Sequence, residues 1–501
     1  MRTQFFIWNL FFLFACLFLS HFIPIFCYLS AVLLLFFIWG CFDVFQKKHT
    51  ILRNFPIVGH VRYLFEKIRP EISQYFIESN TDGKPFSREM RSVVYQRAKK
   101  ELDTLPFGTQ KNVYQEGHEW ICHSMFPIRV NGQDLRILIG THQCEKPYYA
   151  SLLNISAMSY GALSKNAIEA LNMGAKLGNF AHNTGEGGIS PYHLTHKGDL
   201  IWQLGTGYFG ARTLDGKFDP ECFEIKAKNP QIKMIEIKLS QGAKPGHGGI
   251  LPGVKVDQEI AQIRNVEIGK DVLSPPQHSA FSNPAQLVDF LQLLRRRSGG
   301  KPIGIKLCLG LRREFDELCR EMKDKKSFPD YIAIDGGEGG TGAAPLEFSN
   351  SVGYPLDDAL LYVDHTLKTY GIRDHMTVIS SGKIITGFDI IKHLALGADL
   401  CYSARAMMFA LGCIQALRCN SNHCPTGVAT QDKNLVRGLH VPNKAQRVFQ
   451  YHKETLESVS SLMGAMGISN SKDIESHHVM KRVSNTEVSN IEEISNSIKW
   501  S

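Results

Sequence analysis

Residues 331–340 read Tyr-Ile-Ala-Ile-Asp-Gly-Gly-Glu-Gly-Gly, a short apolar run that ends in an acid and a glycine-rich loop. A continuous apolar run of this kind is typical of a strand buried on both faces, as in a parallel sheet. The glycines that follow allow sharp turns and a close approach of the backbone to a ligand. This stretch therefore predicts a buried parallel strand, Tyr331–Asp335, whose carboxyl end opens into a functional loop.

The same pattern recurs on both sides of this stretch. We predict six more strands, at Leu152–Ser159, Asn179–Asn183, Met234–Leu239, Ile303–Leu307, Thr377–Ser381 and Asp399–Ser403. Helical stretches separate many of them, such as Lys165–Leu177, Pro284–Arg297 and Gly387–Leu396. Seven or eight alternating βα units favour a (β/α)8 TIM barrel over an open sheet, and such a barrel carries its active site at the carboxyl ends of its strands.

The amino-terminal region has a different composition. Between Thr3 and Phe42 there is no Asp, Glu, Lys or Arg, and the polar, proline-containing segment Ser20–Pro24 divides this run. We predict two transmembrane helices, near residues 4–20 and 24–43, that form a hairpin. Basic residues flank the run, with Arg2 before it and Lys47, Lys48 and Arg53 after it, so we expect both ends on the cytoplasmic side. A signal peptide is the alternative, but the second apolar run is long enough to stop transfer.

The regions that flank the barrel carry no obvious chemistry. Residues 46–150 predict a small α+β lead-in, with helices at Pro70–Glu78 and Ser87–Glu101 and strands over Phe126–Ile139 around an Asn131-Gly132 turn. Ser87 is the expected helix cap. After the barrel we expect a helix and then a polar tail that is loosely attached from about residue 470. The predicted domains are thus 1–45, 46–150, 151–432 and 433–501.

Composition excludes several classes of protein. The 501 residues are 44% apolar and 21% charged, which excludes a disordered chain. Lys and Arg total 56 against 48 Asp and Glu, a net charge of +8 without a dense basic block. A membrane surface explains this mild excess better than nucleic acid, and we expect no nucleic-acid partner. Twelve cysteines are too few for a disulfide scaffold of this size.

Three cysteines form the strongest chemical motif. Cys413, Cys419 and Cys424 lie within twelve residues, and Pro425 follows the last of them, as in ferredoxin-type sequences. Three thiolates at this spacing can hold one iron–sulfur centre. A structural zinc ion would need a fourth ligand, for which Cys401 and His423 are the candidates. Three unrelated core cysteines are the remaining interpretation.

The last two predicted strands end in candidate phosphate-binding loops, Ser381-Gly382-Lys383 and Ser403-Ala404-Arg405. Loops after strands seven and eight of a barrel commonly bind phosphate through backbone N–H groups, and Arg405 would add a charged fork. Lys306 is a charge inside a buried apolar run. A cation beside a flavin ring would explain it, and an ion pair with a core carboxylate is the alternative.

Two glycine patterns match the dinucleotide-binding spacing, at Gly205, Gly207 and Gly210 and again at Gly337, Gly339 and Gly342. A dinucleotide site needs the glycines to open a helix directly after a strand. Neither pattern opens a clear helix. We therefore do not interpret either as a nicotinamide site.

Five motifs in a fixed order resemble the flavin-binding synthase domain of glutamate synthases. They are residues 156–164, 183–188, 241–246, 336–343 and 424–431. The resemblance implies a (β/α)8 barrel that binds FMN and a [3Fe-4S] cluster, the latter on the three cysteines of the motif. The hairpin and lead-in resemble those of stand-alone, membrane-anchored bacterial proteins of this family. That implies a bacterial inner-membrane location with a cytoplasmic catalytic domain.

The resemblance also implies an activity and residue roles. The activity is that of a glutamate synthase-like oxidoreductase acting on CH-NH2 donors, which aminates 2-oxoglutarate with ammonia and takes electrons from a ferredoxin or a reductase subunit. The implied catalytic residues are Gln241, Lys244 and Lys306, and the implied substrate contacts are Glu186, Lys238 and Lys244. The implied FMN contacts are Ala157, Met158, Ser159, Gln241, Lys306, Gly340, Thr341, Ser381, Gly382, Lys383, Ser403, Ala404 and Arg405.

The chain departs from the family pattern in four respects. It is too short for the amino-terminal glutaminase domain, so we expect ammonia from solution or a partner, and the carboxyl-terminal β-helix is missing. His247 stands in place of an acid, and Ser381-Gly382-Lys383 replaces a glycine pair. Two alternatives stay open: an FMN and iron–sulfur oxidoreductase with a different substrate, and a non-catalytic membrane scaffold that retains the barrel.

Overall fold

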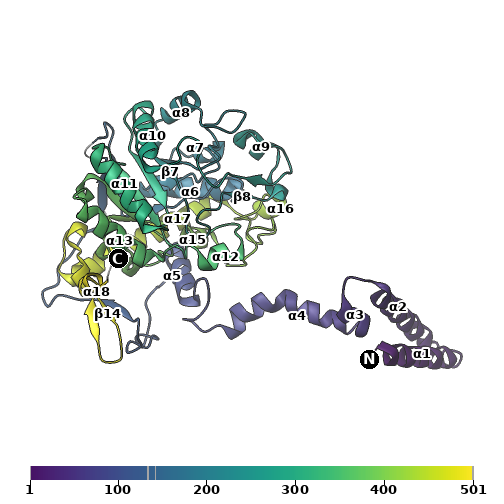
Figure 1. Cartoon of the computed structure of the whole chain (residues 1–501). Coiled ribbons are helices and arrows are strands. Elements are labelled where there is room, and N and C mark those ends of the chain that lie inside the picture. Colours follow the sequence, from purple (N-terminus) through teal and green to yellow (C-terminus); the bar gives the residue numbers. More distant parts are fainter. Residues whose placement is uncertain (1, 133–134, 141–142, 499–501) are drawn as a thin grey trace. The chain divides into compact units, whose positions relative to one another are not determined.

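The computed structural model describes residues 2–132, 135–140 and 143–498. The chain forms two compact units, Met1–Pro85 and Phe86–Ser501 (Figure 1). The described residues of the first unit are helical or irregular, and every strand in the described part of the chain lies in the second unit. The two units are therefore different kinds of structure.

The first unit begins with a pair of apolar helices, α1 (Arg2–Leu19) and α2 (Ile25–Phe45). The break between them falls within the predicted Ser20–Pro24 segment. The helices pack closely because Gly40 leaves space for the Phe5 ring, which a Cβ at Gly40 would overlap. Both helices are long and apolar enough to cross a membrane, by length and composition. The membrane location itself stays a prediction.

The rest of this unit is tied to the end of α2 by a buried acid. Asp43 is fully buried, accepts a hydrogen bond from the Ile57 N–H at 2.8 Å and lies 2.8 Å from His60 Nε2. The short helix α3 (Thr50–Asn54), the helix α4 (Gly59–Ile72) and a π-helical turn (Ser73–Ile77) follow. The helix predicted from Pro70 thus begins earlier, at Gly59, and its proline lies inside it.

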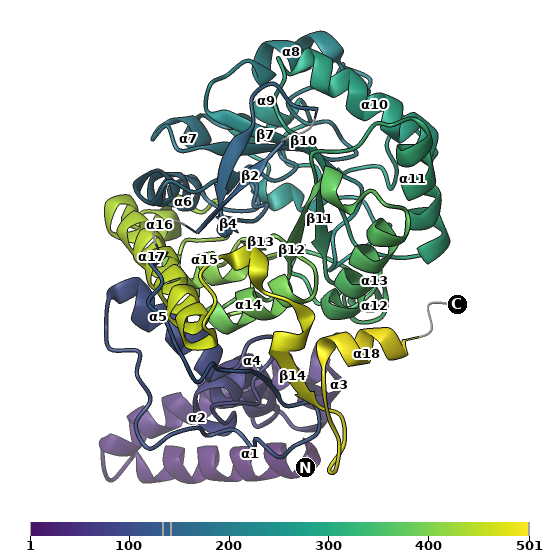
Figure 2. The ribbon, with the colours of Figure 1, turned by 90° about the vertical axis from the view of Figure 1, so that its left-hand side faces the viewer.

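Eight parallel strands form a closed barrel in the second unit (Figure 2). In spatial order they are β4 (Leu153–Ile155), β5 (His182–Asn183), β6 (Leu200–Leu204), β7 (Ile232–Lys238), β10 (Ile303–Leu307), β11 (Tyr331–Asp335), β12 (Thr377–Ser381) and β13 (Leu400–Ser403). Pairing of Cys401 in β13 with Leu153 in β4 closes the ring. The predicted barrel is confirmed, and β10, β11 and β12 have the predicted bounds.

One barrel strand, β6, was not predicted from the sequence. It reads Leu-Ile-Trp-Gln-Leu and is buried along its whole length. The polar Gln203 interrupts its apolar run, and for this reason the sequence pattern does not identify β6 as a strand. Inside the barrel the Gln203 amide donates to Glu236 Oε1 at 2.7 Å, so the polar atom is satisfied by a side chain of the next strand.

Helices follow the strands and surround the barrel. They are α6 (Lys165–Gly178), α7 (Pro191–Leu194), α8 (Pro220–Ala227), α10 (Pro284–Arg297), α11 (Arg312–Asp324), α13 (Leu356–Thr369), α14 (Gly387–Ala395) and α15 (Arg405–Leu411). Insertions add β8 (Ile250–Leu251), α9 (Gln258–Arg264), β9 (Val272–Leu273) and α12 (Leu346–Ser351). After the barrel come α16 (Lys433–Val436) and the long α17 (Val441–Met466). Gly174 of α6 allows Val448 of α17 to approach closely.

The lead-in confirms one prediction and contradicts another. Helix α5 (Arg88–Lys99) is capped by Ser87, whose hydroxyl accepts from the Met90 N–H. The hairpin predicted around Asn131-Gly132 is wrong, since β2 (Arg136–Ile139) pairs with β3 (Tyr148–Ser151) instead. Part of the expected first strand caps α17: the Ile128 N–H donates to the Gly464 carbonyl, one of the last of that helix.

The expectation of a loosely attached tail is also wrong. Strand β14 (Val479–Arg482) pairs on one side with β1 (Glu119–Ile121) of the lead-in and on the other with β15 (Val488–Asn490). The final helix, α18 (Ile491–Ser497), follows. The side chains of Val479 and Ile491 are buried. These isolated apolar residues anchor a segment whose composition is otherwise polar.

The packing at Gly304, in the barrel strand β10, provides a test of the fold. A Cβ there would overlap the ring of Tyr331, its partner on β11. We expect Gly304→Val to lower the free energy of unfolding by about 1–3 kcal/mol, because the core would be overpacked. Gly310→Val is the matched control, since nothing lies within 4 Å of its Cβ. Urea unfolding of the full chain measures both, and equal stabilities would contradict this packing.

Candidate active site

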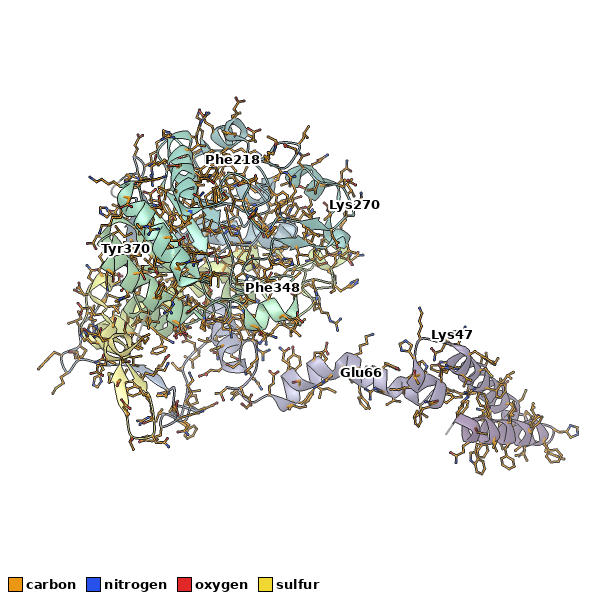
Figure 3. All side chains as sticks on the ribbon, in the orientation of Figure 1. Lys47, Glu66, Phe218, Lys270, Phe348 and Tyr370 are labelled. Carbon is orange, nitrogen blue, oxygen red and sulfur yellow. The ribbon has the colours of Figure 1, made fainter. Side chains whose placement is uncertain are left out.

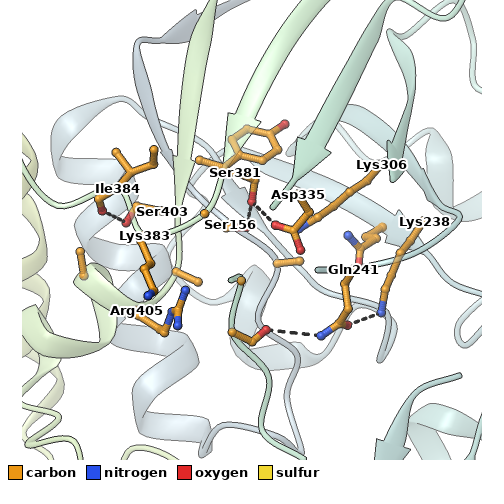
Figure 4. Close-up of a pocket in the computed structure, with 18 of the residues that line it drawn as sticks. Ser156, Lys238, Gln241, Lys306, Asp335, Ser381, Lys383, Ile384, Ser403 and Arg405 are labelled. Carbon is orange, nitrogen blue, oxygen red and sulfur yellow. Dashed lines mark hydrogen bonds and ion pairs between the residues drawn. The ribbon is translucent and has the colours of Figure 1, made fainter. Parts of the chain in front are cut away.

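A polar pocket opens at the carboxyl ends of the barrel strands, where the fold predicts an active site (Figure 4). Eleven of the predicted site residues line it: Ala157, Lys238, Gln241, Lys306, Gly340, Ser381, Gly382, Lys383, Ser403, Ala404 and Arg405. The structure therefore brings together residues that are far apart in the sequence. Whether they bind a cofactor stays a prediction.

Asp335, the last residue of β11, is the centre of the hydrogen bonding in this pocket (Figure 4). Its carboxylate accepts from the Ser381 hydroxyl at 2.6 Å and from the Gly242 N–H at 2.8 Å. Lys306 Nζ lies 3.5 Å away, and both side chains of this pair are buried. Lys306 thus pairs with a core carboxylate, which was the alternative explanation for its buried position. It also lines the pocket.

The loops after β12 and β13 form one end of the pocket. The Ser403 hydroxyl donates to the Ile384 carbonyl at 2.7 Å and ties the two loops together. Arg405 donates through Nη2 to the Glu338 carbonyl at 2.9 Å. Gly340 leaves the space that this arginine occupies, since a Cβ there would lie 2.9 Å from Arg405 Cδ. Burial lowers the pKa of Arg405 to about 10, so it stays cationic at neutral pH.

The middle of the pocket is organised around Lys238, the last residue of β7. Its ammonium donates to Gln241 Oε1 at 2.6 Å and pairs with Glu186 at 2.9 Å. The Gln241 amide donates in turn to the Gly340 carbonyl at 3.4 Å. These contacts hold the Gln241 amide against the pocket. They link the loop after β7 to the loop after β11.

Further cations surround Glu186 beyond the lining of the pocket. Burial would raise the pKa of Glu186, but Lys238, Lys244 and Arg264 together hold it below its ordinary value. Burial lowers the pKa of Lys244 to about 8, while Glu186 opposes the shift. Lys244 Nζ donates to the Ala343 carbonyl at 3.0 Å. This part of the site therefore carries an excess of positive charge beside one carboxylate.

Five of the residues predicted to contact FMN or substrate lie outside the pocket lining: Glu186, Lys244, Met158, Ser159 and Thr341. The first two belong to the cationic group just described. The Ser159 hydroxyl accepts from Arg264 at 3.3 Å, and the Thr341 hydroxyl donates to the Ala343 carbonyl at 3.2 Å. The Met158 side chain is buried.

Eight lining residues were not predicted from the sequence: Phe86, Ser156, Gln203, Asp335, Gly339, Ile384, Tyr402 and Ala406. Asp335 was detectable, since an acid at the end of an apolar strand faces the barrel mouth. Gln203 lay on the strand that the pattern hid. Phe86 belongs to the lead-in, which gave no signal of a site. His247, where the family has an acid, packs its ring against Phe348, which is labelled in Figure 3.

The cysteine loop lies between α15 and α16. The Cys413 thiol accepts from the Gln415 N–H at 3.5 Å, and Cys424 Sγ lies 3.4 Å from the Thr426 hydroxyl. Burial, together with Cys419 and Cys424, raises the pKa of Cys413 to about 12, so the three thiols are electrostatic neighbours. Lys255 interacts electrostatically with two of them, Cys419 and Cys424. Soft thiols with N–H and ammonium groups nearby fit an iron–sulfur cluster.

The positions of the described side chains identify neither a zinc site nor the cluster site. Within residues 2–132, 135–140 and 143–498, no three His, Cys, Asp or Glu side chains are grouped closely enough to hold a metal ion. Cys401 is fully buried in β13, and burial raises the pKa of its thiol well above the ordinary value. The cluster stays a prediction.

The chain is similar to known proteins in family, sequence and fold. A family model described as the conserved region in glutamate synthase matches residues 88–469. The glutamate synthase large subunit-like protein YerD of Bacillus subtilis is 40% identical over 494 residues, which cover 90% of this chain and 93% of that protein. An archaeal-type glutamate synthase (NADPH) of Thermotoga neapolitana is 35% identical over 316 residues. That match covers 62% of this chain and 59% of the relative's length.

A mandelate oxidase mutant with a monooxide FMN adduct is 13% identical and has a TM-score of 0.41. It covers 82% of this chain and 96% of the solved one. At that identity and score the likeness does not extend beyond the arrangement of strands and helices.

The contacts of Asp335 lead to a measurable expectation. Asp335→Asn keeps the size of the side chain but leaves Lys306 as an unpaired buried cation. We expect the free energy of unfolding to fall by about 3–5 kcal/mol, as when one partner of a buried pair is removed. The control is Asp215→Asn, whose pair with Lys217 is exposed. Urea unfolding should show no change for the control, and an equally small change at Asp335 would contradict its central role.

Proposed function

The chain belongs to the glutamate synthase family of oxidoreductases, and on that premise we propose that it aminates 2-oxoglutarate to glutamate. The proposed cofactors are FMN in the pocket and a [3Fe-4S] cluster on Cys413, Cys419 and Cys424. The observation that carries the proposal is the meeting, in one pocket, of Arg405 and the two serine-containing loops with Lys306 and Gln241. These are the features that a phosphorylated, redox-active cofactor requires.

The residues of the pocket divide into two groups for this cofactor. Ser381, Gly382, Lys383 and the loop Ser403–Arg405 would hold its phosphate, because hydroxyls, backbone N–H groups and cations favour an anion. Lys306 and Gln241 would face its ring at the other end. When bound, FMN supplies two-electron transfer. Asp335 keeps Lys306 in place, so a positive charge stands at the ring end of the pocket.

The cationic group around Glu186 is the proposed substrate site. A dicarboxylate such as 2-oxoglutarate needs cations for both of its carboxylates, and Lys238, Lys244 and Arg264 supply them. Glu186 holds Lys238 at 2.9 Å and orients it toward the pocket. Lys244 is the candidate for proton exchange, since burial lowers its pKa to about 8, near the working range of a general acid or base.

The other partners follow from the family. We propose that electrons come from a ferredoxin or a reductase subunit and reach the site through the cysteine loop, and that ammonia comes from solution or from a partner. Helices α1 and α2 would anchor the chain in a bacterial inner membrane, with the catalytic domain in the cytoplasm. The predicted domain boundaries are part of the same proposal.

Gly382 tests the phosphate loop. A carboxylate at this position would stand against the phosphate, and like charges about 4 Å apart repel by roughly 4 kcal/mol at an effective dielectric of about 20. We expect Gly382→Asp to weaken FMN binding about a thousandfold. Gly382→Ala is the matched control for the added Cβ, which would lie 3.0 Å from Leu356 Cδ2. Equal FMN affinity of the Asp variant and the parent would place the phosphate elsewhere.

The cluster and the reaction are tested together on the purified full chain. We expect bound FMN, iron and sulfide, and glutamate formation from 2-oxoglutarate and ammonia with reduced ferredoxin. Cys419→Ser should lower the iron content and leave FMN bound, because a hydroxyl is a poor ligand for cluster iron. Cys222→Ser, which changes a cysteine of α8, should keep its iron.

The remaining outcomes separate the alternatives. Flavin that is reoxidised by another acceptor, without glutamate, would indicate a different substrate. A protein that binds no flavin would indicate a scaffold. A variant that lacks all three loop cysteines and still contains iron would show that the cluster lies elsewhere.

A further inference from the structure

Phe86 is a pocket residue that no motif of the chain predicts. It directly follows the first unit, which ends at Pro85, and it precedes the first residue of the family match, at 88. Its side chain is 1% exposed, and it lines the pocket beside the loops after β12 and β13. The match to the family therefore does not explain why an aromatic residue lines the pocket at this position.

The ring of Phe86 lies against the guanidinium of Arg405. The distance from Arg405 Cζ to the ring centroid is 4.7 Å, within the range of a cation–π interaction. Arg405 has one further contact that restrains its direction, the hydrogen bond from Nη2 to the Glu338 carbonyl. Together, the aromatic face and the carbonyl hold the guanidinium beside the loop Ser403–Arg405.

The backbone of Phe86 is held by Gln415 in the cysteine loop. The Phe86 N–H donates to Gln415 Oε1 at 3.2 Å, and Gln415 Nε2 donates to the Phe86 carbonyl at 3.2 Å. The Gln415 N–H donates to Cys413 Sγ. One amide side chain thus joins the cysteine loop to the backbone that carries the ring.

The ring itself is fixed from the other side by an aromatic group. Phe409 of α15 packs edge-on against Phe86 at 5.3 Å and against Tyr95 of α5 at 6.1 Å. The Tyr95 hydroxyl donates to the Cys413 carbonyl at 2.6 Å. A restrained ring costs less entropy when it holds a cation than a mobile one would.

We propose that Phe86 is a positioning residue of the phosphate subsite, which acts by holding the Arg405 guanidinium, and that Gln415 makes this subsite depend on the cysteine loop. The inference rests on the proposed FMN site. A purely structural residue would support the pocket as a whole. A residue that acts through Arg405 affects only a ligand that has a phosphate.

The experiment titrates the flavin-free full chain with FMN and with riboflavin, which lacks the phosphate. Phe86→Leu should weaken FMN binding about 2- to 30-fold, the range that corresponds to a lost cation–π contact, and leave riboflavin binding unchanged. Phe86→Tyr keeps the ring face and should retain the affinity for FMN. Phe223→Leu, a fully buried aromatic residue of α8, controls for a loosened core and should leave the FMN-to-riboflavin ratio unchanged.

Two further variants test whether Phe86 acts on FMN binding through Arg405 and whether Gln415 supports it. On an Arg405→Met background, Phe86→Leu should cause no additional loss of FMN affinity, because residues that act as one unit are not additive. Gln415→Leu should reproduce the selective loss of FMN affinity, even if Phe86→Leu does not fold. Equal losses for FMN and riboflavin, or additive losses with Arg405→Met, would overturn the inference. A parent chain that binds riboflavin but not FMN would overturn the proposed phosphate site, and this inference with it.

Discussion

The structure of the pocket depends on the contacts of the Asp335 carboxylate. It stands at the end of β11 and accepts hydrogen bonds from Ser381 at the end of β12 and from Gly242 in the loop after β7. It also faces Lys306 at the end of β10. One buried charge therefore fixes the relative positions of a loop that would hold phosphate, a loop that would hold substrate, and the cation between them. Because each contact comes from a different βα unit, the arrangement exists only when the barrel is closed.

The charges of the pocket are balanced in pairs. Lys306 is matched by Asp335, and Lys238 by Glu186, so neither ammonium is buried without a partner. Glu236 lies deeper in the barrel, where burial raises its pKa and the amides of Asn183 and Gln203 satisfy one oxygen. Lys244 and Arg264 are the cations in excess, which gives the region around Glu186 its positive charge. Pairing thus preorganises the cations at little cost in mutual repulsion.

The two proposed cofactor sites are joined by one short helix. Helix α15 begins at Arg405, beside the phosphate loops, and ends at Leu411. Gly412 terminates it in a left-handed conformation with φ of 109°, and Cys413 follows at once. Seven residues of helix span about 10 Å, so a single rigid element sets the distance between the two sites. The lead-in reinforces this link through Phe86 and Tyr95.

The sequence by itself determined the barrel, the apolar helical pair and most of the pocket. Continuous apolar runs identify β10, β11 and β12 because both faces of those strands are buried, and glycine and serine at their ends mark the loops. Only the tertiary structure decided the rest. Gln203 interrupts the apolar pattern of β6, and its polar partner, Glu236, lies on another strand. Lys306 is tolerated in a buried apolar run because its partner, Asp335, lies on the neighbouring strand β11. Likewise, the tail is held by a strand of the lead-in, and Phe86 enters the pocket from outside the barrel. Apolar patterns report how much of one element is buried, whereas the partner of a polar or isolated side chain is set by contacts between segments that the sequence keeps far apart.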